Sequence, residues 1–167
     1  MGVADHKVNA PKQVRVFVVT VSDTRTEEND TSGRAAKEMI LAAGHLVAGY
    51  RILKDEPAQV AALVKQIVAE RLADVVVTSG GTGVSTRDST YEAIAGLLDK
   101  RLDGFGEIFR MLSYQEIGSA AMLSRAVGGL VGGVAVFATP GSTAAVKLAL
   151  EKLILPELGH LKLEAHR

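Results

Sequence analysis

The chain has 167 residues, with 19 lysines and arginines against 19 aspartates and glutamates, and it contains no cysteine. The balanced charge argues against nucleic acid and anionic membranes as partners, since both require a basic surface. The lack of cysteine excludes disulfides, thiolate catalysis and cysteine-bound metal, and a hydrophobic fraction of 47% predicts a large core or, as we favour, an apolar subunit interface.

Strands and helices alternate along the sequence. Apolar, β-branched runs predict strands at residues 14–21, 46–53, 75–78 and 134–138. Amphipathic stripes and capping signals predict helices at residues 33–43, 57–72, 90–100, 106–118 and from 142 to Pro156, which should end the last helix. This alternation predicts an α/β fold, a three-layer α/β/α sandwich around a mostly parallel sheet.

A polar N-terminal tail is expected over residues 1–11, followed by a single domain over residues 12–167. The tail lacks the apolar core of a signal peptide. The most apolar window, residues 126–138, is too short and too rich in glycine to span a bilayer. The sequence therefore predicts a cytoplasmic protein without a membrane partner.

Four polar loops are expected to follow strands. They are VSDT (21–24), KDE (54–56), TSGGTG (78–83) and TPGS (139–142). Because the carboxyl ends of parallel strands meet at one edge of the sheet, and ligands bind at that edge, the four loops are expected to form one site.

The glycine loop at residues 80–83 has two interpretations of about equal weight on its local sequence. Its glycines allow the backbone N–H groups to turn inward and bind an anion, with hydroxyls from Thr78, Ser79 and Thr82 beside them. The same residues also fit an ordinary glycine turn. Neither the G-x-G-x-x-G dinucleotide pattern nor the P-loop pattern is present.

Two acidic residues belong to these loop regions. Asp55 lies within KDE, and Asp88 lies at the end of the longer segment TSGGTGVSTRD. Asp88 precedes a capping-box pattern of Ser89 and Glu92, and Asp55 fits a turn before Pro57, so each acid has a structural interpretation. Together, beside an anion site, they indicate a divalent cation, because Mg²⁺ takes one or two carboxylates and completes its shell with phosphate oxygens. The pair therefore indicates a polyphosphate that is bound with its metal.

Two further positions also have structural interpretations. Ser142 fits the N-cap of the last helix, although the start of that helix is also suited to an anion. Glu107 and Arg110 are three residues apart in a predicted helix, which favours an intrahelical ion pair.

Taken together, the motifs resemble the MoaB/MogA family of molybdenum cofactor biosynthesis, which is related to the G domain of gephyrin. The segments GFGEIFRMLSYQEIG (104–118) and PGST (140–143) resemble its MoaB branch more than MogA. The segments that carry the resemblance are VTVSDT, DTSG, KDE, TSGGTGVSTRD, GFGEIFRMLS, LSR and TPGS. The resemblance implies a molybdopterin adenylyltransferase, which uses ATP with Mg²⁺ and releases pyrophosphate. It also implies a trimer or hexamer.

The resemblance further implies individual residue roles. Asp55 and Asp88 are expected to be catalytic and to hold Mg²⁺ when nucleotide is bound. The residues expected to line the pocket for substrate and nucleotide are Ser22, Asp23, Ser79, Gly80, Gly81, Thr82, Gly83, Glu107, Pro140, Gly141 and Ser142. The implied partners are molybdopterin, ATP, other copies of the chain and enzymes of the molybdenum pathway. The alternative is a non-catalytic molybdopterin-binding or assembly protein, which need not keep the acid pair.

Overall fold

The computed structural model describes residues 10–167, so residues 1–9 of the predicted tail lie outside the described residues. Its centre is a six-stranded sheet in the order β2-β1-β3-β6-β5-β4. The strands are β1 (Arg15–Val21), β2 (Leu46–Leu53), β3 (Val75–Ser79), β4 (Lys100–Arg101), β5 (Val127–Val131) and β6 (Val134–Thr139). Strands β2, β1, β3 and β6 are parallel, whereas β5 is antiparallel to β6 and β4 is antiparallel to β5.

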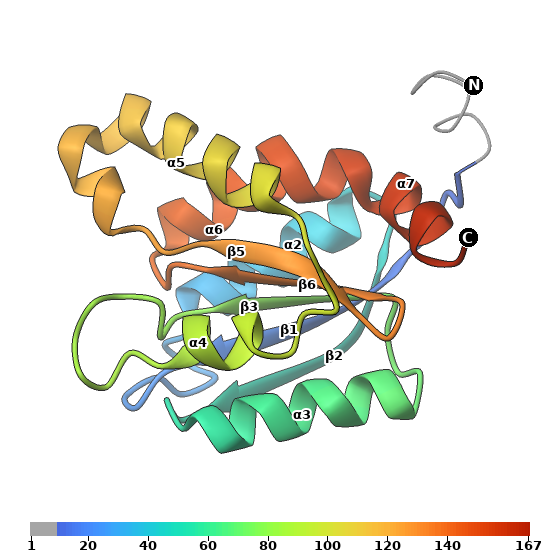
Figure 1. The fold of residues 1–167 in the computed structure, drawn as a ribbon, viewed down its shortest axis with the longest axis horizontal. Helices are drawn as coiled ribbons and strands as arrows, with labels where there is room; N and C mark the ends of the chain where they lie inside the picture. Colours follow the sequence, from blue (N-terminus) through green and yellow to red (C-terminus); the bar gives the residue numbers. More distant parts are fainter. Residues whose placement is uncertain (1–9) are drawn as a thin grey trace.

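Helices cover both faces of this sheet (Figure 1). One face carries α2 (Thr31–Ala42), α5 (Asp103–Ile117), α6 (Thr143–Ala149) and α7 (Leu155–Ala165), and the other carries α3 (Pro57–Ala69) and α4 (Thr90–Ala95). A 3-10 segment, η1 (Gly118–Leu123), follows α5, and a π-helical turn, η2 (Leu150–Ile154), joins α6 to α7. This arrangement confirms the predicted three-layer sandwich.

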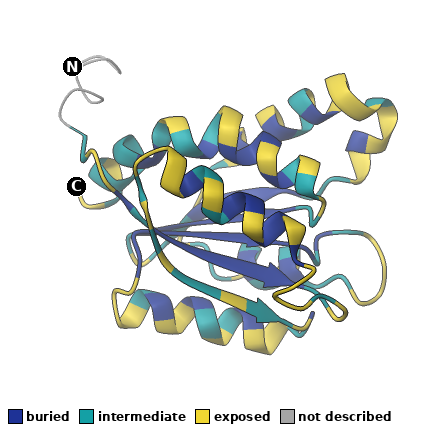
Figure 2. Ribbon diagram, turned by 180° about the vertical axis from the view of Figure 1, so that it is seen from behind, coloured by how far each residue is buried: buried dark blue, intermediate teal, exposed yellow. Residues whose placement is uncertain are grey.

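The strand sequences explain why the sheet is buried on both faces. In β1 the side chains of Val16 and Val18 enter the core under α2 and α6, whereas Phe17, Val19 and Val21 enter the core under α3 and α4. Successive side chains of a strand point to opposite faces, so a continuous apolar run supplies both cores. Figure 2 shows these central strands as buried and the outer faces of the helices as exposed.

The apolar window at residues 126–138 contains a β-hairpin that the sequence analysis did not predict. Gly132 and Gly133 have φ values of +54° and +83° and connect the paired residues Val131 and Val134. Two residues with positive φ form the tight turn that suits an antiparallel hairpin. The glycine pair therefore reverses the chain, and β5 runs antiparallel to β6.

Pro156 does not end the last helix, which was predicted to stop there, because the chain continues as α7 to Ala165. The helix widens into one π-helical turn directly before the proline, which then lies in the first turn of α7. Inside a continuing helix a proline lacks the N–H for the bond to the preceding turn, and its ring crowds the carbonyl four residues earlier. A π-helical turn is one of the ways in which a helix accommodates such a disruption.

The helix predicted at residues 90–100 is also shorter than expected and ends at Ala95. The following residues turn toward the sheet, where the backbone N–H of Asp99 donates to the carbonyl of Leu130 at 2.8 Å. This bond leads the chain into β4 at the sheet edge. Among the described residues, no helix is long and apolar enough to cross a membrane.

Candidate functional site

The four polar loops lie at the carboxyl edge of the parallel strands and are hydrogen-bonded to one another (Figure 1). The N–H of Ser22 donates to the carbonyl of Leu53 at 2.8 Å, which joins the ends of β1 and β2. The N–H of Gly80 donates to the carbonyl of Thr139 at 3.0 Å, which joins the ends of β3 and β6. The parallel sheet therefore brings together the loops that sequence analysis assigned to one site.

The glycine loop approaches its neighbours so closely that side chains are excluded. A Cβ at Gly80, where φ is +97°, would lie 2.1 Å from the carbonyl oxygen of Val21. A Cβ at Gly81, where φ is +66°, would lie 2.1 Å from Oγ1 of Thr90 and 2.6 Å from Oδ2 of Asp55. Both the positive φ and the close contacts require glycine at these positions.

Asp55 is buried against this loop, with 7% of its surface exposed. Its Oδ1 accepts hydrogen bonds from the Oγ of Ser89 at 2.8 Å and from the N–H of Ser89 at 3.2 Å. These bonds show that the predicted capping box is wrong: the Ser89 hydroxyl makes no bond to the start of α4 and donates to Asp55 instead. The other carboxylate oxygen, Oδ2, lies beside Gly81.

Asp88, which directly precedes Ser89, orders the end of the same loop. Its Oδ2 accepts a hydrogen bond from the N–H of Ser85 at 2.9 Å, and a Cβ at Gly83 would lie 2.6 Å from that oxygen. Asp55 and Asp88 therefore contact opposite ends of one short glycine segment, and each holds the loop through one carboxylate oxygen.

The residues present fit a metal-borne phosphate group at this position. The buried Oγ1 of Thr90 has no hydrogen-bond partner among the described residues, and it lies beside the same glycine as Oδ2 of Asp55. Carboxylate oxygens are the ligands that Mg²⁺ takes in proteins. The described residues contain no group of three or more His, Cys, Asp or Glu side chains that could hold a metal, so the two acids would need ligands from substrate or water.

An ion-pair cluster joins three of the loops at the surface, and sequence analysis did not predict it. The guanidinium of Arg87 donates to both carboxylate oxygens of Asp23 at 3.1 Å and to Oε1 of Glu56 at 3.2 Å. The hydrogen bond from Arg87, together with one from the N–H of Asp55, lowers the pKa of Asp23. Because the three residues come from different loops, only the fold could reveal this cluster.

Asp30 of the DTSG segment is a buried carboxylate whose hydrogen bonds stabilise the loops of the candidate site. It accepts hydrogen bonds from the hydroxyls of Thr20 at 2.6 Å and Tyr50 at 2.5 Å, and from Arg25 at 3.1 Å. Arg25 also donates to the carbonyl of Gly141 at 3.3 Å. The network therefore ties the TPGS loop to the loop that follows β1.

This network shifts the pKa of both acidic groups at its centre. Burial acts to raise the pKa of Asp30, but hydrogen bonds, the strongest of them from Thr20 and Tyr50, outweigh it and lower the pKa to about 2. The pKa of Tyr50 is raised by its burial and by its bond to the Asp30 carboxylate. Asp30 is therefore ionised and Tyr50 is neutral at neutral pH.

The remaining predicted residues take structural positions in their loops. Ser22 accepts from the N–H of Arg25 at 3.1 Å, and Ser142 accepts from the N–H of Ala145 at 3.1 Å, as expected for an N-cap. Pro140 precedes Gly141, whose Cβ would lie 3.1 Å from the Cα of Gly80, so the two glycine-containing loops pack directly on each other. Thr82 is buried in the glycine loop.

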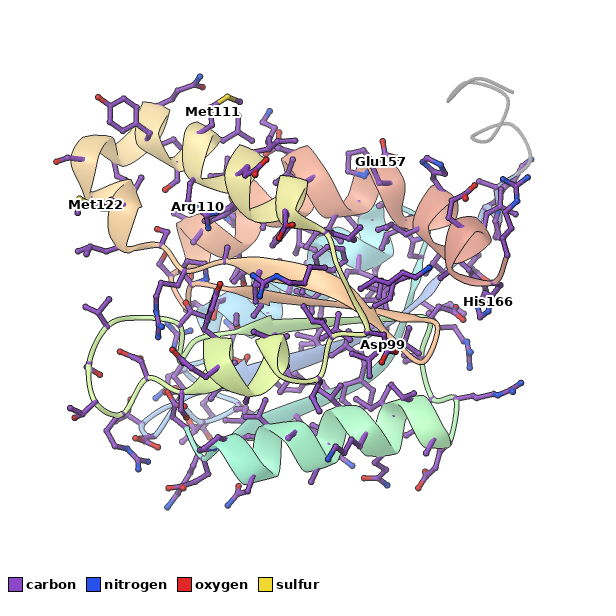
Figure 3. All side chains as sticks on the ribbon, in the orientation of Figure 1. Asp99, Arg110, Met111, Met122, Glu157 and His166 are labelled. Carbon is purple, nitrogen blue, oxygen red and sulfur yellow. The ribbon has the colours of Figure 1, made fainter. Side chains whose placement is uncertain are left out.

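Glu107 is the one predicted residue that the fold does not join to these loops. It is exposed on α5, and among the described residues no hydrogen bond or ion pair connects it with them. The ion pair expected between Glu107 and Arg110 does not form either. Arg110 instead extends toward the sheet and donates to the carbonyl of Ala126, just before β5, at 3.2 Å (Figure 3).

The chain is similar to known proteins over most of its length. Residues 17–160 match the family described as a probable molybdopterin binding domain. The sequence is 54% identical to molybdenum cofactor biosynthesis protein B of Bacillus cereus, over 100% of this chain and 99% of that protein. A crystal structure of a molybdenum cofactor biosynthesis protein B superposes with a TM-score of 0.91 at 54% identity, covering 95% of this chain and 99% of the other. The tungsten cofactor synthesizing protein MoaB from Pyrococcus furiosus superposes with a TM-score of 0.83 at 42% identity, covering 95% and 100%.

Proposed function

This chain belongs to the MoaB/MogA family of molybdopterin-binding proteins of molybdenum cofactor biosynthesis, and from that premise we propose that it is a molybdopterin adenylyltransferase. In the proposed reaction, an oxygen of the terminal phosphate of molybdopterin attacks the α-phosphorus of ATP. A new P–O bond forms as the bond between the α-phosphorus and its bridging oxygen to the β-phosphate breaks. The products are adenylyl-molybdopterin and pyrophosphate.

This chemistry requires positioning and charge neutralisation rather than a protein nucleophile. A phosphate monoester is largely ionised at neutral pH, since its second pKa is about 6, so the attack needs no general base. The four loops would hold the two anionic substrates at one edge of the sheet. Mg²⁺, when it binds with the nucleotide, would neutralise phosphate charge, and Asp55 and Asp88 are the residues that would hold it.

The observation that carries the proposal is the placement of two acids around one glycine segment. Gly81 allows Oδ2 of Asp55 and Oγ1 of Thr90, which has no hydrogen-bond partner within residues 10–167, to reach the same space, and Asp88 contacts Gly83. A carboxylate by itself would weaken phosphate binding at such a loop. A pair of carboxylates beside it is explained if the phosphate arrives with a divalent cation.

One observation favours the second candidate function, a non-catalytic molybdopterin-binding protein. Both acids already accept hydrogen bonds from the loop that follows β3, Asp55 from Ser89 and Asp88 from Ser85. A protein that only binds molybdopterin would need the same bonds to keep the loop ordered. The acids could therefore be present for the loop alone.

An isosteric substitution separates these two functions. In Asp55→Asn and Asp88→Asn, the amide oxygen can still accept the loop hydrogen bond, while the negative charge is lost. We expect pyrophosphate release to fall by about 10²-fold to 10³-fold, with the melting temperature and molybdopterin binding retained. The measurement is pyrophosphate release by the purified protein with molybdopterin, ATP and Mg²⁺.

The control variant is Asp103→Asn, which removes an exposed carboxylate at the start of α5 and should release pyrophosphate at the wild-type rate. Unchanged turnover in both acid variants would remove the acids from the catalytic mechanism. Molybdopterin binding without any turnover by the wild-type protein would replace the proposal with the binding function.

A further inference from the structure

Arg125, which precedes β5, contacts the backbone of the glycine loop from outside the four polar loops. We propose that Arg125 is a positioning residue that fixes the glycine loop in its anion-binding conformation. The inference rests on the proposed function for its catalytic consequence, while its structural consequence can be tested without turnover.

The guanidinium of Arg125 donates to two consecutive carbonyls of the loop. Its Nε lies 3.0 Å from the carbonyl oxygen of Thr82 and 3.0 Å from that of Gly83, and its Nη2 lies 2.6 Å from the carbonyl oxygen of Gly83. These are contacts across 43 and 42 residues of sequence. The loop that follows β3 is therefore held by a side chain from the start of β5.

The orientation of these carbonyls determines where the neighbouring N–H groups point. In a planar trans peptide the C=O of one residue and the N–H of the next point in opposite directions. Because the carbonyls of Thr82 and Gly83 face Arg125, the N–H groups of Gly83 and Val84 face away from it. Neither N–H donates a hydrogen bond among the described residues, so both are available to an anion.

Helix α4 holds Arg125 in this position. Its Nη1 forms an ion pair with Oε1 of Glu92, its Nη2 lies 3.4 Å from Oε2 of Glu92, and the guanidinium lies over the ring of Tyr91 at 5.0 Å from the centroid. The planar guanidinium donates several hydrogen bonds in fixed directions. The ammonium of lysine sits on a flexible stem and has no such fixed arrangement of donors. An arginine at this position can therefore bridge α4 and the two loop carbonyls together.

The test compares Arg125→Gln and Arg125→Lys with wild type and with Arg51→Gln. Arg51 is an exposed residue of β2 whose side chain donates, within the described part of the chain, to the carbonyl of the preceding Tyr50. In both Arg125 variants we expect faster hydrogen exchange of the amides at residues 79–88, with unchanged exchange in β1 and β2. The kcat/KM for ATP should fall by about 10²-fold in Arg125→Gln, because misplacement by about 1 Å can have an effect of that size. In Arg125→Lys the kcat/KM for ATP should fall less, since lysine keeps the positive charge but not the planar set of N–H donors.

The outcomes separate the inference from the proposed function. Faster loop exchange with weaker binding of Mg-ATP by calorimetry supports the positioning role even if the wild-type protein shows no turnover. Unchanged loop exchange in folded Arg125→Gln and Arg125→Lys would overturn it, whatever the activity. Faster loop exchange with Mg-ATP affinity and kcat/KM within twofold of wild type would also overturn it, because the conformation of the loop would then not matter to the ligand.

Discussion

At the scale of single residues, Asp30 illustrates how a buried charge is stabilised in this protein. Its carboxylate accepts hydrogen bonds from Thr20, Tyr50, Arg25 and Gly33 and is almost fully shielded from solvent. A buried charge is unfavourable unless it is paired and hydrogen-bonded, and here both requirements are met. The same carboxylate holds Arg25, which donates to the TPGS loop, so its charge also supports the candidate site.

We predict that Asp30→Asn destabilises the protein at neutral pH by on the order of 2 kcal/mol. The folded-state pKa is lowered from 3.8 to about 2, so the contribution of the charge is complete above about pH 4 and is lost as the pH falls toward 2. The amide would also place an NH₂ group among groups that donate. Urea unfolding of wild type and variant should show similar differences in unfolding free energy at pH 7 and pH 4, and a smaller difference at pH 3. A difference that stays constant over this range would contradict the role of the charge.

Some site residues could be predicted from the sequence, and others could not. Asp55 and Asp88 stand in short loops after predicted strands, and the sheet then brings those loops together. The bond from Ser89 to Asp55 joins residues 34 positions apart, and the local capping pattern of Ser89 and Glu92 suggested a different partner for that hydroxyl. The contacts of Arg125 could not be predicted, because they are made with backbone carbonyls 42 and 43 residues away, which no local pattern encodes.

At the scale of elements, the glycine loop is constrained by contacts as well as by backbone conformation. The two effects can be separated, because Gly44 after α2 also has positive φ, +85°, but a Cβ there would meet nothing within 4 Å. Gly81 has φ of +66° and in addition the contacts with Thr90 and Asp55. The loss of stability on substitution by alanine should therefore differ between the two glycines only by the effect of the close contacts around Gly81.

We predict that Gly81→Ala lowers the free energy of unfolding more than Gly44→Ala does. The backbone conformation should contribute about 1–2 kcal/mol in both variants, and the overlap at Gly81 should add about 1–3 kcal/mol. Because the loop must shift to relieve the overlap, Gly81→Ala should also weaken Mg-ATP binding, whereas Gly44→Ala should not. Urea unfolding and calorimetry measure the two effects. Equal losses of stability in both variants would show that the contacts around Gly81 relax without strain.

The elements themselves were predictable where the hydrophobic period was long and unbroken. β2 matches the predicted residues 46–53, and α3 begins at the predicted Pro57. The β5–β6 hairpin could not be predicted from the hydrophobic period, because residues 126–138 are apolar on both sides of Gly132 and Gly133 and no change of period marks the turn. The sequence around Pro156 predicts a helix end because a local rule for proline does not include the π-helical turn that accommodates it.

At the scale of the whole molecule, α5 and the 3-10 segment after it carry an exposed apolar surface. Figure 2 shows the outward face of α5 as exposed, and Figure 3 shows Met111 and Met122 extending away from the sheet. Phe105 and Phe109 lie on the buried side of α5. The exposed apolar residues of this surface are Ile108, Met111, Tyr114, Ile117, Met122 and Leu123. A cluster of this kind on one element is typical of a protein interface.

We predict that this surface mediates self-association into the trimer or hexamer that the family resemblance implies. In Met122→Glu a charge replaces an apolar side chain that is 79% exposed in the single chain, so the fold should be retained while association is lost, because an unpaired charge in an apolar interface is strongly unfavourable. Light scattering after gel filtration should give a trimeric or hexameric mass for wild type and a monomeric mass for the variant, with unchanged circular dichroism. Leu41→Glu, which places the same charge at an exposed leucine of α2, should keep the wild-type mass. A monomeric wild type, or a Met122→Glu variant of unchanged mass, would show that this surface does not join the subunits.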